Sequence, residues 1–179
     1  MVEVIRITTE TLSGIPSIVY GLFGMLFFVT YLGWGYSLLA GSFTIAIMIL
    51  PPIIRTTEEA LKAVTDGYRE ASFALGAGKL RTIFRVVLPA AVPGILAGII
   101  LAIGRIVGET AALIYTAGTV AKIPESLLAS GRTLSVHMYT LSSEGLHTNE
   151  AYATAFVLLL IVLLINTLSG FIAKKITKG

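Results

Sequence analysis

Residues 92–117 read VPGILAGIILAIGRIVGETAALIYTA, and this stretch decides the class of fold. The hydrocarbon core of a bilayer is about 30 Å thick, so a helix needs roughly 20 predominantly apolar residues to cross it. The stretch is long enough, and its only charged residues are one arginine and one glutamate. Gly94, Gly98 and Ala102 recur at every fourth position, a spacing that lets another membrane helix approach closely. We therefore predict a membrane-spanning helix that packs against a neighbouring helix.

The rest of the chain also has the composition of a membrane protein. Hydrophobic residues make up 55% of its 179 positions and charged residues 13%, whereas soluble domains carry about 25% charged residues. Three further apolar runs can cross a bilayer, at about Ile15–Leu32, Tyr36–Ile54 and Ala151–Ala173. We predict an all-α, polytopic membrane protein with four transmembrane helices. Pro51 and Pro52 should break or kink the second helix, because proline donates no backbone N–H.

The basic residues are distributed unevenly among the segments that flank these spans. Segment 118–150 holds only Lys122 and Arg132. Cytoplasmic segments of membrane proteins carry an excess of Lys and Arg, so we predict that this segment is external and that both termini are cytoplasmic. The predicted cytoplasmic set is Arg6, Arg55, Lys62, Arg69, Lys79, Arg81, Arg85, Lys174, Lys175 and Lys178.

Residues 70–89, EASFALGAGKLRTIFRVVLP, lie in the basic segment between the second and third spans. Their first part has helical spacing and leads to Gly76, which can adopt the left-handed conformation that ends a helix. In the second part, Arg81 and Arg85 lie four residues apart on one face of an amphipathic stretch. This periodicity fits a helix that docks on a partner protein and equally a helix that lies on lipid headgroups.

The spacing within this segment resembles the EAA motif of ABC importer permeases, which reads E-A-A, three residues, G, nine residues, I, one residue, L-P. Ser72 replaces the second alanine and Val86 replaces the isoleucine. The resemblance implies that residues 55–90 form a cytoplasmic coupling loop, whose short helix docks into a groove on an ATP-binding subunit. The residues expected to carry this coupling are Glu70, Ala71, Ser72, Gly76, Leu88 and Pro89.

The arginine and the glutamate of the third span, Arg105 and Glu109, lie one turn apart on the predicted helix. A charge inside a membrane costs about 3 kcal/mol on insertion scales, so each should face a partner or a water-filled path. One interpretation is a buried structural ion pair. The other is that Arg105 offers its guanidinium to a passing oxyanion while Glu109 orients and partly neutralises it.

Several segments, spread over nearly the whole chain, are similar to the PstA-type phosphate permease family. They include GIPSIVYG at residues 14–21, LGA at 75–77, GRIVGET at 104–110, and the tail from Thr133 to Asn166. The resemblance implies that residues 1–179 form an ABC transporter type-1 transmembrane domain with the type I importer permease fold. Members of that family have six spans, so we expect the chain to be N-terminally truncated, with two helices missing before Met1.

The resemblance also implies a function and a set of partners. The chain would be the permease subunit of an ATP-driven importer of inorganic phosphate in the cell (inner) membrane, with a substrate path that includes Arg105, Glu109 and Thr110. Its expected partners are a PstC-like permease, PstB-like ATPases, a PstS-like extracytoplasmic phosphate-binding protein and membrane lipid, and we expect no nucleic acid. Two alternatives stay open: a permease for molybdate or sulfate, and a four-span membrane protein without a transport role.

The chain is not expected to be an enzyme or to bind a cofactor. No Gly-rich loop followed by Lys-Ser or Lys-Thr is present, so ATP should be hydrolysed by a partner subunit. The chain has no cysteine, which excludes disulfides and thiolate metal sites. His137 and His147 lie in the predicted external segment without an evident third ligand, so we assign no catalytic residue and no metal site.

Overall fold

The structure, a computed structural model, describes residues 2–145 and 147–178, except for the side chains of Val2, Ile5 and residues 174–178. Every element in these ranges is a helix, which confirms the all-α prediction. Lys174, Lys175 and Lys178 were part of the prediction of orientation, and their side chains lie outside this description. The helices in order are α1 (Val2–Ser13), α2 (Ser17–Gly24), the π-helix η1 (Met25–Tyr31), α3 (Leu38–Lys62), α4 (Asp66–Ala74), α5 (Lys79–Thr82), the π-helix η2 (Ile83–Val87), α6 (Leu88–Gly108), α7 (Ala111–Ile114), α8 (Leu134–Glu144) and α9 (Thr148–Lys178).

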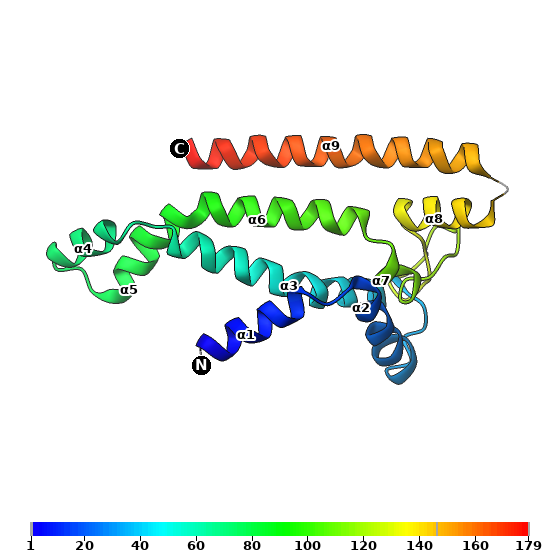
Figure 1. Cartoon of the computed structure of the whole chain (residues 1–179), viewed down its shortest axis with the longest axis horizontal. Coiled ribbons are helices and arrows are strands. Elements are labelled where there is room, and N and C mark those ends of the chain that lie inside the picture. The colour runs from blue at the N-terminus through cyan, green and yellow to red at the C-terminus, as the bar shows by residue number, and fades with distance from the viewer. Residues whose placement is uncertain (1, 146, 179) are drawn as a thin grey trace.

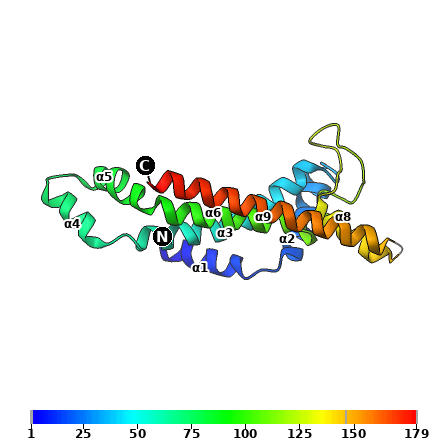
Figure 2. The same ribbon diagram turned by 90° about the horizontal axis from the view of Figure 1, so that it is seen from above.

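Three long apolar helices form the body of the molecule. Among the described residues, Leu38–Lys62, Lys79–Gly108 and Thr148–Ala173 are long and apolar enough to cross a membrane. They correspond to the second, third and fourth predicted spans, and α6 packs against both α3 and α9. Figures 1 and 2 show α4 and α5 at one end of this body and α7, α8 and the loop before α8 at the other end.

The first predicted span, Ile15–Leu32, corresponds to the helical segment Ser17–Tyr31, which is shorter than the three long helices. The described chain bends by 99° between Arg6–Ser13 and Ser17–Tyr31. Pro16 causes this break, because proline disfavours the helical conformation of the residue before it and is itself extended, with a ψ of 142°. Ser17–Tyr31 is at most about 22 Å long, which is short of the membrane core. The two halves provide a fourth span only when they are counted together.

The second span is longer than predicted, and its prolines do not break it. Helix α3 passes through Pro51 and Pro52 and ends at Lys62. Membrane helices tolerate proline because neighbouring helices and Ser or Thr side chains satisfy the backbone groups that it leaves free. The expectation of a break was therefore incorrect, and α3 carries the chain directly to the segment that contains α4.

Helices α3 and α6 approach each other closely through glycine, as the small-residue spacing predicted. A Cβ atom added at Gly94 would lie 2.8 Å from the Cβ of Ala60, and one added at Gly98 would lie 2.8 Å from the Cβ of Thr56. Beside this crossing, Val64, Val87 and Ala91 form a buried apolar cluster. Small residues are needed here because a lipid environment provides no hydrophobic drive for helix association and leaves packing as a main source of stability.

We predict that Gly98→Ala lowers the thermal stability of the protein in detergent, because the added methyl group pushes α3 away from α6. Forcing extra methyl groups into a packed site costs about 1–3 kcal/mol. Gly170→Ala, which also adds a methyl group inside a long helix, is the control because no atom of another helix in the described part of the chain lies within 4 Å of its new Cβ. Equal melting temperatures for the two variants would contradict the close crossing.

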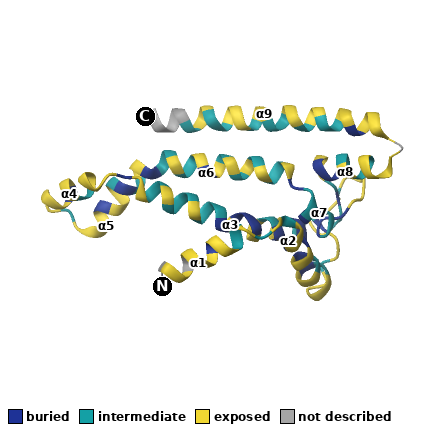
Figure 3. Ribbon diagram, viewed as in Figure 1, coloured by how far each residue is buried: buried dark blue, intermediate teal, exposed yellow. Residues whose placement is uncertain are grey.

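Buried residues gather where α2, α3, α7 and α8 meet (Figure 3). One cluster joins Tyr20, Met48 and Ala112, and another joins Leu113, Ala117 and Val136. In contrast, none of the residues in the most apolar part of α9 is buried. The exposed surface of this long helix is therefore available to lipid or to other subunits, as expected of a multi-pass membrane protein.

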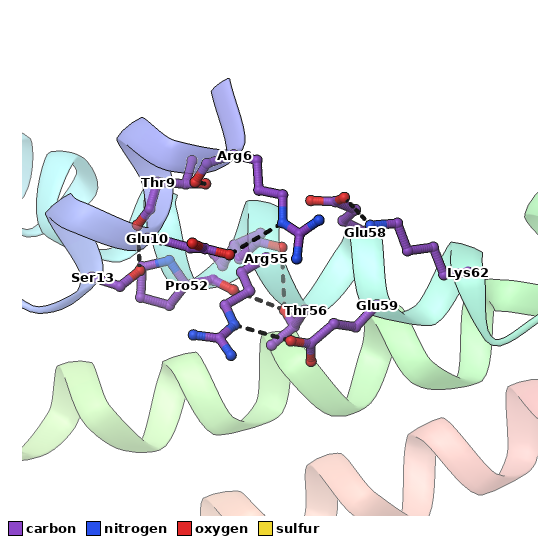
Figure 4. A network of polar contacts seen from close by, with 11 residues as sticks. Arg6, Thr9, Glu10, Ser13, Pro52, Arg55, Thr56, Glu58, Glu59 and Lys62 are labelled. Carbon is purple, nitrogen blue, oxygen red and sulfur yellow. Dashed lines mark hydrogen bonds and ion pairs between the residues drawn. The ribbon is translucent and has the colours of Figure 1, made fainter. Parts of the chain in front are cut away.

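The end of α3 that leads to α4 also lies beside α1 and carries several ion pairs (Figure 4). The Nε of Arg6 lies 3.2 Å from Oε1 of Glu10, and the Nε of Arg55 lies 3.0 Å from Oε1 of Glu59. Each pair connects residues of the same helix, and the side chains are largely exposed. Such pairs contribute about 0.3–0.5 kcal/mol each, so they support their own helices rather than fastening α1 to α3.

Candidate functional site

The predicted third span ends at Gly108, not at Ala117. Glu109 is extended, with a ψ of 129°, and the chain then starts the short helix α7. The Glu109 side chain is only 8% exposed, and its Oε1 accepts a hydrogen bond from the N–H of Ala112 at 3.1 Å. Its backbone carbonyl accepts a hydrogen bond from the Ser135 hydroxyl at 2.7 Å. Glu109 therefore joins the end of α6 to both α7 and α8.

Glycines in α2 allow a second set of contacts at this break. A Cβ atom added at Gly21 would lie 2.8 Å from the Cα of Ala112, and one at Gly24 would lie 2.8 Å from Cγ2 of Thr116. The backbone of α2 thus packs directly on the turn that Glu109 holds. These glycines provide close packing, and α2, α7 and α8 together fix the position of the break.

Arg105 lies in the last turn of α6 and is exposed. Its guanidinium makes no hydrogen bond or ion pair with any other residue that the structure describes. The expectation that Glu109 lies one helical turn away and neutralises it is incorrect, because the helix ends before Glu109 and the carboxylate binds a backbone N–H instead. Thr110 follows the break, and its hydroxyl donates to the Gly108 carbonyl at 3.3 Å.

The free guanidinium restricts what can surround the last turn of α6. An arginine that faces lipid costs about 3 kcal/mol on insertion scales and more by other estimates. Arg105 is surrounded by apolar residues along its own helix. We therefore expect the assembled protein to offer this side chain a water-filled space or a polar partner.

We predict that Glu109→Gln keeps the protein folded and that Glu109→Leu destabilises it. The glutamine carbonyl can still accept the Ala112 N–H, whereas leucine leaves a buried donor unpaired at a cost of about 1–3 kcal/mol. Melting temperatures of the purified variants provide the measurement. If the two variants had the same stability, the bond to α7 would not hold the break.

The second part of the site is α4 with the turn that follows it. Gly76 has a φ of +80°, as expected for a glycine that ends a helix. Its N–H donates to the Phe73 carbonyl at 2.9 Å, and the Ala77 N–H donates to the Ser72 carbonyl at 3.1 Å. This pair of hydrogen bonds is the Schellman motif. The prediction that a helix ends at Gly76 is confirmed.

Two side chains fasten α4 to the long helices. The Arg69 guanidinium donates to the Leu61 carbonyl at 2.9 Å and to the Val64 carbonyl at 3.0 Å, so it satisfies groups at the end of α3. On the other side of α4, the buried hydroxyls of Ser72 and Thr82 lie 2.9 Å apart. Sequence reasoning counted Arg69 only as a positive charge, although basic residues commonly bind the last carbonyls of a helix. It assigned no role to Thr82.

The outer surface of α4 and α5 presents apolar side chains to the surroundings. Leu75, directly after α4, is 89% exposed, and Leu80 in α5 is 72% exposed. Phe73 in α4 and Phe84 in the adjoining η2 are also exposed. Glu70 and Ala71 lie on this surface, whereas Ser72 is buried against α5. Leu88 and Pro89 begin α6 directly after η2. Exposed apolar clusters on a polar segment commonly mark a contact with another protein.

Comparison with known proteins places the chain in a family. The model of the "Binding-protein-dependent transport system inner membrane component" family matches residues 3–179. The probable ABC transporter permease protein YqgI of Bacillus subtilis is 36% identical over 98% of this chain and 65% of its own length. The phosphate transport system permease protein PstA 1 of Mycobacterium tuberculosis is 35% identical over 99% of this chain and 60% of its own length. PstA 2 of Mycobacterium bovis is 46% identical over 65% of this chain and 38% of its own length.

A solved structure supports the same fold. The inward-facing MetNI methionine ABC transporter matches with a TM-score of 0.75 and 23% identity, over 95% of this chain and 73% of the matched chain. The predicted type I importer permease fold and the resemblance to PstA-type permeases are confirmed. The chain spans about two thirds or less of the length of the curated relatives named here. It belongs to the family of inner-membrane components of binding-protein-dependent transport systems.

Proposed function

We propose that this chain is a permease subunit of an ATP-driven importer and that its substrate is inorganic phosphate. The observation that supports a substrate path is the exposed, unpaired guanidinium of Arg105 inside an apolar helix. Arginine presents a planar set of donors that matches the oxygens of phosphate, often with two parallel hydrogen bonds. The 35–46% identity to PstA-type permeases supports phosphate over other oxyanions.

In this proposal the residues at the break have separate roles. Arg105 binds the passing anion, and Glu109 holds the turn between α6 and α7 at a fixed distance from it. The Thr110 hydroxyl donates to the Gly108 carbonyl at 3.3 Å, and by turning away from this long bond it can donate to the anion instead. Among the described residues Glu109 makes no ion pair with Arg105, and its Oε1 accepts the Ala112 N–H, so the guanidinium is left open to phosphate in this proposal.

The apolar surface of α4 and α5 is the proposed contact with the ATP-hydrolysing subunit. The bonds from Arg69 and Ser72 make α4 a rigid extension of α3 and α5, so a movement of the partner would be transmitted to the long helices. The chain itself binds no cofactor in this proposal. The proposed partners are PstB-like ATPases, a PstC-like second permease and a PstS-like phosphate-binding protein outside the membrane.

The proposed orientation puts α4 in the cytoplasm and the segment between α7 and α8 outside. Leu75 and Ile123 are 89% and 88% exposed at these two ends, and the chain has no native cysteine to interfere. We predict that an impermeant thiol reagent labels Ile123→Cys in intact cells and labels Leu75→Cys only after the cells are opened. If only Leu75→Cys were labelled in intact cells, the orientation would be the opposite of the one proposed.

The substrate can be tested by competition in cells whose other phosphate uptake systems are deleted. Uptake of radiolabelled phosphate through the complete transporter should fall in the presence of excess unlabelled phosphate and should be unchanged by excess sulfate or molybdate. Strong competition by either of these anions would instead indicate a permease for that oxyanion. If the transporter, expressed and assembled with its partners, moved none of the three labelled anions, the oxyanion proposal would be wrong.

A further inference from the structure

The two basic residues of the segment between α7 and α8 line one cavity. Lys122 and Arg132 are ten positions apart in the sequence, and no other Lys or Arg lies between α7 and α8. Both line a cavity of about 380 Å³, together with His137 on the first turns of α8. The loop that carries the two cations projects from the helices in Figure 2. Three residues whose side chains can bind an anion thus line the same pocket.

Contacts within the loop hold these residues together. Gly131 lies so close to Pro124 that an added Cβ would be 2.6 Å from the Pro124 Cγ, which brings the segment after Lys122 against the segment before Arg132. Arg132 also approaches the Thr119 carbonyl, at 3.5 Å.

The loop is also tied to neighbouring helices. The Leu39 N–H donates to the Leu127 carbonyl at 2.9 Å, which fixes the loop to the start of α3. The His137 N–H donates to the Thr133 carbonyl at 2.8 Å, which holds the histidine in a regular turn of α8. The cavity is therefore part of a defined loop structure.

The residues that line the cavity leave its positive charge uncompensated. The lining residues that the structure identifies include no carboxylate. Glu125 is the only acidic residue between α7 and α8. It follows Pro124 but is exposed and does not line the cavity. Two cations that share a space without an acidic partner repel each other, and an anion bound between them would relieve this repulsion.

We propose that Lys122, Arg132 and His137 form a second oxyanion site that binds a phosphate group. Arginine supplies paired donors for two phosphate oxygens, and lysine adds a mobile point charge. On the proposed function and orientation, this site lies outside the membrane and concentrates substrate before it reaches Arg105. The phosphate group can belong to inorganic phosphate or to a lipid headgroup. Ile123 lines the cavity, and Ile123, Leu127 and Leu128 are exposed apolar side chains of the same loop that can contact lipid.

The test uses the full-length chain in the complete membrane complex, without the soluble binding protein and without ATP. All variants carry Arg105→Gln, so that phosphate bound at the proposed path does not contribute. Complexes in neutral phosphatidylcholine nanodiscs are dialysed against radiolabelled phosphate, and complexes in discs with added phosphatidylglycerol are analysed for retained anionic lipid. Lys122→Gln/Arg132→Gln is compared with the matched control Arg55→Gln/Lys62→Gln, which removes one arginine and one lysine from exposed positions of α3 at the other end of the molecule.

Each source of phosphate has its own signature. For inorganic phosphate, the parent complex and the control bind the ion, and Lys122→Gln/Arg132→Gln binds it at least about tenfold more weakly, because charge-assisted hydrogen bonds are lost. For a lipid headgroup, free phosphate does not bind in phosphatidylglycerol discs, and Lys122→Gln/Arg132→Gln retains less anionic lipid than the control. Equal phosphate binding and equal lipid retention in both double variants would overturn the proposal.

Failure of this site can be distinguished from failure of the proposed function. If the site captures substrate, Lys122→Gln/Arg132→Gln with native Arg105 should need about tenfold more phosphate for half-maximal uptake while the maximal rate stays the same. If phosphate binds to the cavity but the native complex transports none, the second site stands and the proposed function fails. If uptake is normal and no difference is seen in binding, lipid retention or half-maximal concentration, the proposed function stands and the second site fails.

Discussion

Arg105→Ala should abolish phosphate uptake by the full-length chain in its complete transporter. The guanidinium is the free cation in the last turn of α6, and a paired set of charge-assisted hydrogen bonds contributes about 3 kcal/mol or more, which corresponds to a loss of about a hundredfold or more. The amount of assembled complex should not fall, because Arg105 makes no hydrogen bond or ion pair with the described residues. Initial rates of radiolabelled phosphate uptake, normalised to complex in the membrane, provide the measurement.

Two further variants separate the role of Arg105 from a general effect of charge. Arg105→Lys keeps the charge but loses the planar pair of donors, so uptake should be intermediate. Arg55→Ala removes an exposed arginine at the opposite end of the bundle, where it pairs with Glu59, and should leave uptake close to normal. Normal uptake by Arg105→Ala would show that Arg105 is not part of the substrate path. Loss of assembled complex in Arg105→Ala would indicate a structural role instead.

Gly76→Val should uncouple ATP hydrolysis from substrate while the protein still inserts into the membrane. The φ of +80° costs a residue with a side chain about 1–2 kcal/mol, and a β-branched residue tolerates it least. The strained turn would release the end of α4 and move Leu75, which is 89% exposed on the proposed docking surface. We expect substrate-stimulated ATPase activity of the complex to fall about tenfold, the effect of roughly 1.4 kcal/mol on a binding equilibrium.

Gly76→Asn is the matched control for this prediction. Asparagine is similar in size to valine but adopts the left-handed conformation readily. Apart from the neighbours in sequence, no described residue has an atom within 4 Å of a Cβ at this position. Stimulated ATPase activity should therefore survive in Gly76→Asn. If both variants lost activity, the partner would require the absence of any side chain. Full activity in Gly76→Val would contradict a docking role for this turn.

The sequence predicted the features that depend on chain length and local sterics. Apolar runs of about 20 residues correctly predicted the three long helices, because the thickness of the membrane sets the length of a helix that crosses it. The spacing of Gly94 and Gly98 predicted that another helix packs closely against α6, because only small residues permit such an approach, and α3 is that helix. Gly76 predicted the end of α4 for the same local reason, since glycine adopts a positive φ with the least strain of any residue.

The features that depend on distant contacts could not be predicted. Nothing in the apolar run after Gly108 marks the end of α6, because the break is held by the bond from Glu109 to Ala112 and by Ser135, which lies 26 residues later. The ion pair predicted between Arg105 and Glu109 is not formed for the same reason, because α6 ends before Glu109. The role of Arg69 depends on the path of the chain between α3 and α4, which places its guanidinium at the last carbonyls of α3.

The most direct test of the account is ATP-driven transport by purified components. The full-length chain would be reconstituted in proteoliposomes with its second permease, its ATPases and its phosphate-binding protein, oriented so that ATP reaches the face that carries α4. Radiolabelled phosphate should then accumulate on that face only when ATP is present, and substitution of Arg105→Ala should abolish the accumulation. Phosphate movement that is independent of ATP, or no movement in a fully assembled complex that hydrolyses ATP, would contradict the account.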